Sequence, residues 1–186
     1  MLLIRYFAGR LPASRSVVGL YAVIVCLVYS WTLFTSFYKL SAWMFYLNLS
    51  EIASIYAYAF LFDLAESFLL LALVLSIELA LLLNVLKNRD EFQTRAVIFV
   101  FVLLCSMAIR LALFKDYEDV NAFVNGETAW LVLATVISIL SGVAASKNLL
   151  FRRFVDGFAD RAVIFLYIYV PLSLISGVVV IWRNLF

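Results

Sequence analysis

The sequence contains no histidine and only two cysteines among its 186 residues. Without histidine the chain lacks the commonest metal ligand, the usual haem ligand and the usual general base. Cys26 and Cys105 both lie within apolar runs, where a free thiol behaves as a small hydrophobic side chain. The sequence therefore predicts no metal site and no cofactor, and the two cysteines give no zinc spacing.

Charge is scarce as well, because charged residues make up 14% of the chain and hydrophobic residues 67%. A soluble domain is typically about 45–50% apolar and about 25% charged. The excess of apolar residues is too large for a buried core and indicates that lipid is the solvent. No loop is long enough for a soluble domain, so we expect residues 1–186 to form a single membrane domain. No motif for binding nucleic acid is present.

Five apolar runs reach the roughly 20 residues that a helix needs to cross a bilayer. They are 17–37, 62–86, 96–114, 128–146 and 162–182. The sequence thus predicts an all-α polytopic integral membrane protein, a helix bundle with five transmembrane helices.

Two further segments are apolar without being assigned to a span. Residues 1–15 fit either an amphipathic helix in the membrane interface or a frayed tail. Residues 38–60 are aromatic rather than polar, as expected at the headgroup level. Residues 52–60 either lie in this interface or extend the second helix beyond the bilayer.

Basic residues predict how the chain is threaded. With the N-terminus in the cytoplasm, ten lysines and arginines lie on the inner side and three on the outer side. The positive-inside rule therefore predicts an N-in, C-out topology. Acidic residues contribute little to orientation and are not counted. The expected location is a cell membrane crossed several times, in a bacterium or an archaeon.

The second apolar run carries three carboxylates, at Asp63, Glu66 and Glu78. On a helix with about 100° per residue, these three fall with Ser67 and Asn84 within an arc of about 120°. Such a stripe is expected to face other helices or a water-filled cavity rather than lipid. A charged group at mid-helix costs about 2.5–3.5 kcal/mol, which the surrounding leucines offset. The segment therefore inserts as written.

Arg110 is the only basic residue inside a predicted span. If Lys87 and Arg95 lie at equal depth on antiparallel helices, Arg110 and Glu78 lean toward each other, since side chains tilt toward a helix N-terminus. We therefore predict a buried Glu78–Arg110 ion pair. Asp63 and Glu66 are expected nearer the outer interface, with no basic partner at their depth.

Small residues recur every fourth position of the fourth run, at Ala134, Ser138, Gly142 and Ser146. Such a ridge lets another helix approach closely; its partner lies either within the chain or in another protein. Pro171 removes a helical hydrogen bond from the fifth run and predicts a kink there.

Three functions follow from these features. The first is a non-catalytic subunit or scaffold of a membrane complex, acting through helix packing, with lipid and other subunits or further copies of itself as partners. The alternative is a small transporter or ion- or proton-conducting protein that uses the intramembrane carboxylates and Arg110. The third is an intramembrane enzyme that uses a carboxylate.

Overall fold

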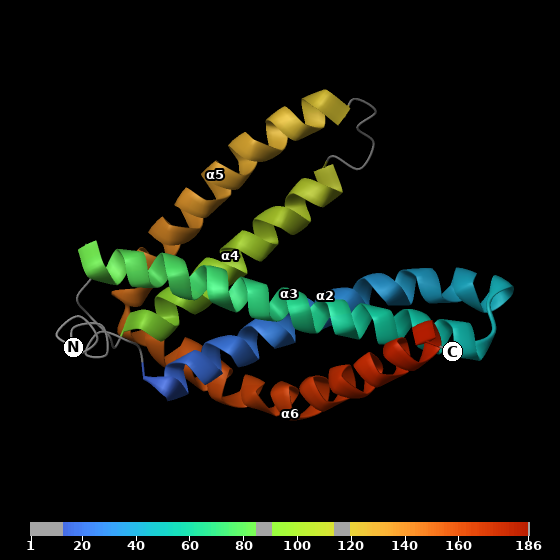
Figure 1. Cartoon of the computed structure of the whole chain (residues 1–186). Helices are drawn as coiled ribbons and strands as arrows, with labels where there is room; N and C mark the ends of the chain where they lie inside the picture. The colour runs from blue at the N-terminus through green and yellow to red at the C-terminus, as the bar shows by residue number, and fades with distance from the viewer. Residues whose placement is uncertain (1–12, 85–90, 114–119, 186) are drawn as a thin grey trace. The chain divides into compact units, whose positions relative to one another are not determined.

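The computed structural model describes the backbone of residues 13–84, 91–113 and 120–185. Within these ranges the side chains of residues 79, 81–84, 111–113 and 120–125 are not described. The described residues form five α-helices, labelled α2 to α6 in Figure 1. They are α2 (Ser14–Tyr46), α3 (Leu49–Asn84), α4 (Phe92–Leu113), α5 (Val120–Ser146) and α6 (Leu149–Leu185).

All five helices are long and apolar enough to cross a membrane. The prediction of an all-α membrane protein with five spanning helices is therefore confirmed. The predicted interfacial helix of residues 1–15 falls almost entirely on residues 1–12, which lie outside the described part of the chain.

Three helices are longer than predicted. At about 1.5 Å per residue, the 33 residues of α2, the 36 of α3 and the 37 of α6 extend about 50, 54 and 55 Å. Residues 38–46 continue α2, and residues 49–60 belong to one uninterrupted α3. The predicted polar loop 147–161 is helical from Leu149 onward. Arginine, lysine and aromatic residues are compatible with a helix, and none of these three segments contains proline.

An asparagine occupies the N-cap position of both α3 and α6. The Asn48 backbone N–H donates to Glu51 Oε2 at 2.8 Å, which is the reciprocal half of a capping box at the start of α3. The Leu150 N–H donates to Asn148 Oδ1 at 3.0 Å and satisfies an otherwise unpaired donor of α6. Connections of two residues between α2 and α3, and between α5 and α6, therefore suffice.

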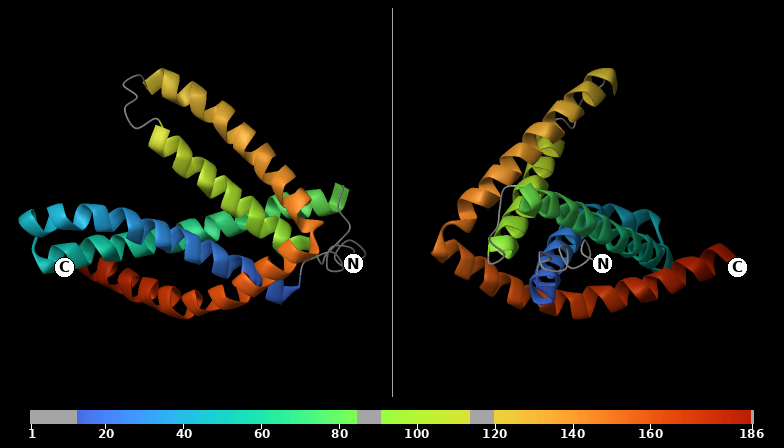
Figure 2. Two further views of the ribbon diagram at one scale, coloured as in Figure 1. Left: turned by 180° about the vertical axis from the view of Figure 1, so that it is seen from behind. Right: turned by 60° about the vertical axis from the view of Figure 1, so that its left-hand side comes forward.

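The chain divides into two compact units. Unit 1 comprises Met1–Ser16 and Val74–Gly157, and unit 2 comprises Val17–Leu73 and Phe158–Phe186. In unit 1, α4 and α5 pack side by side in antiparallel directions (Figures 1 and 2). In unit 2, α2, the first part of α3 and most of α6 run alongside one another (Figure 2).

Contacts within unit 2 show that α3 runs antiparallel to both of its neighbours. Tyr56 on α3 bonds to Ser36 on α2, and Asp63 on α3 bonds to Thr32 on α2. Residue numbers therefore rise along α3 in the direction in which they fall along α2. Tyr58 bonds to Asn184, near the end of α6. The part of α6 in unit 2 therefore runs in the same direction as α2, because both are antiparallel to α3. Pro171 lies inside α6, and the part of α6 in unit 2 is bowed (Figure 2).

Candidate functional site

Ion pairs join the helices of unit 1 at one end of α4. Arg95 Nε donates to Glu78 Oε2 at 3.3 Å, and the two side chains are 1% and 6% exposed. Arg95 Nη1 also contacts Glu91 Oε2 at 3.4 Å. The Ser146 hydroxyl donates to that same Glu91 oxygen at 3.2 Å. The network therefore connects the last part of α3, the start of α4 and the end of α5.

A second ion pair lies at the other end of the α4–α5 pair. Arg110 Nε donates to Glu127 Oε1 at 2.9 Å, with side chains 10% and 24% exposed. The Arg110 guanidinium also lies over the ring of Trp130, 5.6 Å from its centroid. This is a cation–π contact, which strengthens when the cation is desolvated.

These pairs correct the predicted partner of Glu78, which is Arg95 and not Arg110. The prediction set Arg95 level with Lys87, whereas in the structure Arg95 is buried against Glu78, which lies nine residues before Lys87 in the chain. Arg110 lies fifteen residues further along α4, about 22 Å at 1.5 Å per residue. It therefore reaches the first turns of the α5 span instead.

The predicted small-residue ridge lies on α5 against α4. Ala134, Ser138, Gly142 and Ser146 are all buried. A methyl group at Gly142 would come within 2.8 Å of the Arg95 carbonyl oxygen, so the two backbones touch where glycine leaves room. The step of fifteen residues from Gly142 back to Glu127 matches the step from Arg95 forward to Arg110. The two helices therefore stay in register along their contact.

A row of hydroxyl-bearing side chains lies between the helices of unit 2. We call this row the polar seam. Its α2 members are Tyr21, Tyr29, Thr32 and Ser36, which fall within about 80° of one helix face. Tyr21 contacts Ser67 at 3.4 Å, and Ser36 accepts from the Tyr56 hydroxyl at 3.2 Å. These bonds satisfy polar groups that would be costly to leave unpaired in an apolar interface.

The middle of the polar seam contains Asp63. Thr32 Oγ1 donates to Asp63 Oδ1 at 2.8 Å, and the residue is 5% exposed. Tyr29, which interacts electrostatically with Asp63, bonds through its hydroxyl to Ser173 on α6 and, at 3.3 Å, to the Phe60 carbonyl oxygen on α3. Asp63 therefore sits in a buried polar region to which three helices contribute.

The five residues of the predicted polar stripe do not form one cluster. Asp63 and Ser67 belong to the polar seam of unit 2, whereas Glu78 belongs to the ion pairs of unit 1. Glu66 is exposed on α3. Asn84 is the last residue of α3, and its side chain lies outside the described part. Among the residues that the structure describes, no group of three or more histidine, cysteine and acidic side chains is arranged for a metal ion.

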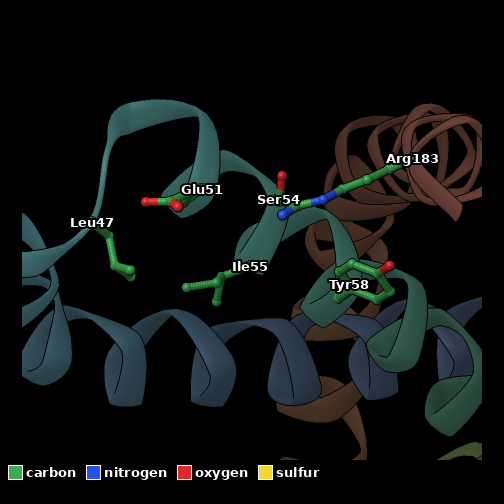
Figure 3. A pocket seen from close by; sticks show the side chains of 6 residues that line it. All are labelled: Leu47, Glu51, Ser54, Ile55, Tyr58 and Arg183. Atoms are coloured by element: carbon green, nitrogen blue, oxygen red, sulfur yellow. The ribbon is translucent and has the colours of Figure 1, made fainter. Parts of the chain in front are cut away.

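One hollow of about 360 Å³ lies in unit 2, where the α2–α3 connection meets the end of α6. Figure 3 shows the residues that line it, with Arg183 extending from α6 toward Ser54 on α3. The other lining residues are Leu47, Glu51, Ile55 and Tyr58. The hollow is open and shallow, and Glu51 is already used to cap α3.

Sequence reasoning missed the α2 half of the polar seam and both partners of the arginines. Tyr21, Tyr29, Thr32 and Ser36 follow one another at spacings of eight, three and four residues, a helical pattern that the sequence displays. Glu127 precedes an apolar run and resembles an ordinary loop residue.

Comparisons of the chain with protein-family models, curated proteins and solved structures found no match.

Proposed function

We propose that the protein is a non-catalytic subunit of a membrane complex that acts through helix packing, and that α3 carries its partner-binding face. The observation that carries the proposal is the position of Glu66. It is exposed near the middle of Leu49–Glu78, the segment of α3 that qualifies as a membrane span. No ion pair of Glu66 is formed among the residues that the structure describes.

The surroundings of Glu66 make exposure to lipid unfavourable. Phe62, Leu69 and Leu73 share its face of α3 and are 70%, 72% and 50% exposed. A carboxylate in the middle of such a stripe costs about 2.5–3.5 kcal/mol if it faces hydrocarbon. Intramembrane carboxylates almost always face protein or water instead. A helix of another subunit, carrying a lysine or arginine at this depth, would cover the stripe and pair with Glu66.

The intramembrane charges of unit 1 support a packing role. Arg95 and Arg110 are each held by a glutamate within unit 1, and the small-residue ridge of α5 contacts α4. These groups are engaged in holding the helices of the chain together. Glu66 differs from them in having an apolar, exposed setting.

Site-specific photo-crosslinking in native membranes tests the proposal. A photoreactive residue at position 66 is expected to give a protein adduct of one defined mass, because a partner helix lies against it. The matched control is position 174, since Leu174 is 62% exposed on α6 of the same unit; this position is expected to label lipid.

Two results decide the outcome. Glu66→Gln removes the charge at nearly constant volume and is expected to weaken the adduct-forming complex on native gels. If position 66 labels lipid as position 174 does, the partner face does not exist and the proposal fails. An adduct of twice the chain mass identifies a second copy of this chain as the partner in place of a different subunit.

A small transporter or ion- or proton-conducting protein is the second candidate, and the buried Asp63 favours it. A transporter needs a path for water to its carboxylates. After replacement of Cys26 and Cys105, single cysteines at positions 63, 66 and 78 are expected to react with membrane-impermeant thiol reagents if such a path exists. If positions 63 and 78 do not react, conduction is contradicted and the subunit role remains.

As a multi-pass membrane protein the chain contacts lipid. We propose that it is located in the plasma membrane of a bacterium or archaeon, with the N-terminus inside.

A further inference from the structure

We propose that Asp63 and Thr32 form a binding site for one small monovalent cation, a proton or Na⁺, between α2 and α3. This inference goes beyond the subunit role and does not depend on a partner at Glu66. It concerns the carboxylate that faces into unit 2, whereas the partner face concerns the exposed carboxylate one turn away.

One carboxylate oxygen of Asp63 is buried without a hydrogen-bond partner in the described part of the chain. Thr32 bonds to Asp63 Oδ1 at 2.8 Å, whereas Asp63 Oδ2 is fully buried and has no hydrogen-bond partner in the described part of the chain. Buried polar atoms normally have partners, and an ionised carboxylate without one carries the full desolvation cost of its charge. A bound cation removes that charge.

Asp63 also lacks a positively charged side chain to compensate its negative charge among the described residues. No lysine or arginine forms an ion pair with Asp63 among the described residues. The polar groups around the middle of the polar seam are hydroxyls, phenols and one further carboxylate: Tyr21, Tyr29 and Thr32 on α2, Glu66 and Ser67 on α3, and Tyr169 and Ser173 on α6. None of these groups is positively charged, so within the described part of the chain the charge of Asp63 is not compensated, and a bound cation would supply the compensation.

The single carboxylate of Asp63 favours a monovalent cation over a divalent one. One buried carboxylate carries a single negative charge, which a monovalent ion neutralises. Ca²⁺ takes 6–8 oxygen ligands, usually with several carboxylates, and no cluster of three such residues is present in the described part. The oxygen bonded to Asp63 is the uncharged Thr32 hydroxyl, and Tyr29, which interacts electrostatically with Asp63, is bonded to two further uncharged oxygens, the Phe60 carbonyl and the Ser173 hydroxyl. These are suitable for Na⁺ or for a proton shared with a hydroxyl.

Two measurements on the purified full-length protein in lipid nanodiscs test the site. The first follows thermal unfolding as NaCl replaces N-methylglucamine chloride at constant ionic strength, because an ion that binds only the folded state stabilises it with increasing concentration. The second records the infrared carbonyl band of a protonated carboxylic acid across a pH series without sodium. The Asp63→Asn variant keeps the shape but removes the charge, and Asp156→Asn is the matched control because Asp156 is exposed on α6.

The expected result is that wild type and Asp156→Asn show one of the two signals and that Asp63→Asn lacks it. Loss of the sodium-dependent shift identifies Na⁺ as the occupant, and loss of the protonated-acid band identifies a proton. If Asp63→Asn responds to sodium and pH as the wild type does, the proposal is overturned.

Thr32→Val keeps the test decisive if Asp63→Asn does not fold. It removes only the hydroxyl that bonds to Asp63 Oδ1, and hydrogen bonds to charged groups are the stronger class. We expect the midpoint of the sodium titration, or the proton concentration at the midpoint of the infrared titration, to change by roughly tenfold. An unchanged midpoint contradicts the site. Partner crosslinking at position 66 is read separately, so either proposal can fail alone.

Discussion

Replacing Gly142 with alanine tests the close contact between α4 and α5. The added methyl carbon would lie 2.8 Å from the Arg95 carbonyl oxygen and 3.4 Å from the Arg95 Cα and carbonyl carbon. A carbon and a carbonyl oxygen normally approach to about 3.3–3.6 Å. One helix must therefore move by about 0.5–0.8 Å, and Arg95 moves with it, although its side chain pairs with Glu78.

The size of the effect follows from two opposing terms. Overpacking of a tight contact costs about 1–3 kcal/mol. Alanine is favoured over glycine within a helix by up to about 1 kcal/mol. We therefore expect Gly142→Ala to lower the free energy of unfolding by about 0–2 kcal/mol, and to be less stable by about 1–3 kcal/mol than a glycine-to-alanine change in an open part of a helix.

Two other helical glycines provide matched controls. A methyl group at Gly157 would meet no atom within 4 Å, and at Gly177 it would lie 3.5 Å from Leu61 Cδ1, an ordinary contact. Gly157→Ala is therefore expected to be neutral or stabilising, with Gly177→Ala close to it. Unfolding with dodecyl sulfate in mixed micelles, followed by circular dichroism, ranks the three variants. If Gly142→Ala is as stable as Gly157→Ala, the two backbones are not in contact there and the reasoning fails.

Three further predictions concern the ion pairs, the polar seam and a helix cap. In double-mutant cycles Glu78 is expected to couple to Arg95 by 0.5–3 kcal/mol, roughly the range for contacting residues, and to be additive with Arg110 within about 0.5 kcal/mol; the opposite ranking would restore the pairing inferred from the sequence. Tyr29→Phe removes the hydroxyl bonded to Ser173 and the Phe60 carbonyl and is expected to cost about 1–3 kcal/mol in the same unfolding assay; an unchanged stability would argue against those bonds. Asn148→Ala removes the α6 cap and should cost about 1 kcal/mol, whereas a loss of a few tenths or less would mean that the cap is not formed.

The membrane class and the number of helices were accessible from the sequence because each depends on local composition. A run of about 20 apolar residues is sufficient to identify a span, and the described part of each of the five predicted runs lies within a helix of the structure. Helix ends were less predictable. The aromatic stretch after residue 37 and the charged stretch after Lys147 resemble interfacial or loop segments, but the first is helical except at residues 47–48 and the second is helical from Leu149 onward, since neither contains proline. The asparagine caps at Asn48 and Asn148 were the better signal.

The partners of the polar residues were decided only by tertiary structure. The sequence identified Glu78 and Arg110 as out of place in an apolar run, and this depended on composition alone. The choice of Arg95 for Glu78 and Glu127 for Arg110 depends on the register of α4 against its neighbours. That register is fixed where Gly142 admits the backbone of Arg95, a contact between residues 47 positions apart. Asp63 likewise stood out in the sequence as a carboxylate in an apolar run, but only the packing of α2 against α3 leaves one of its oxygens buried without a partner in the described part of the chain.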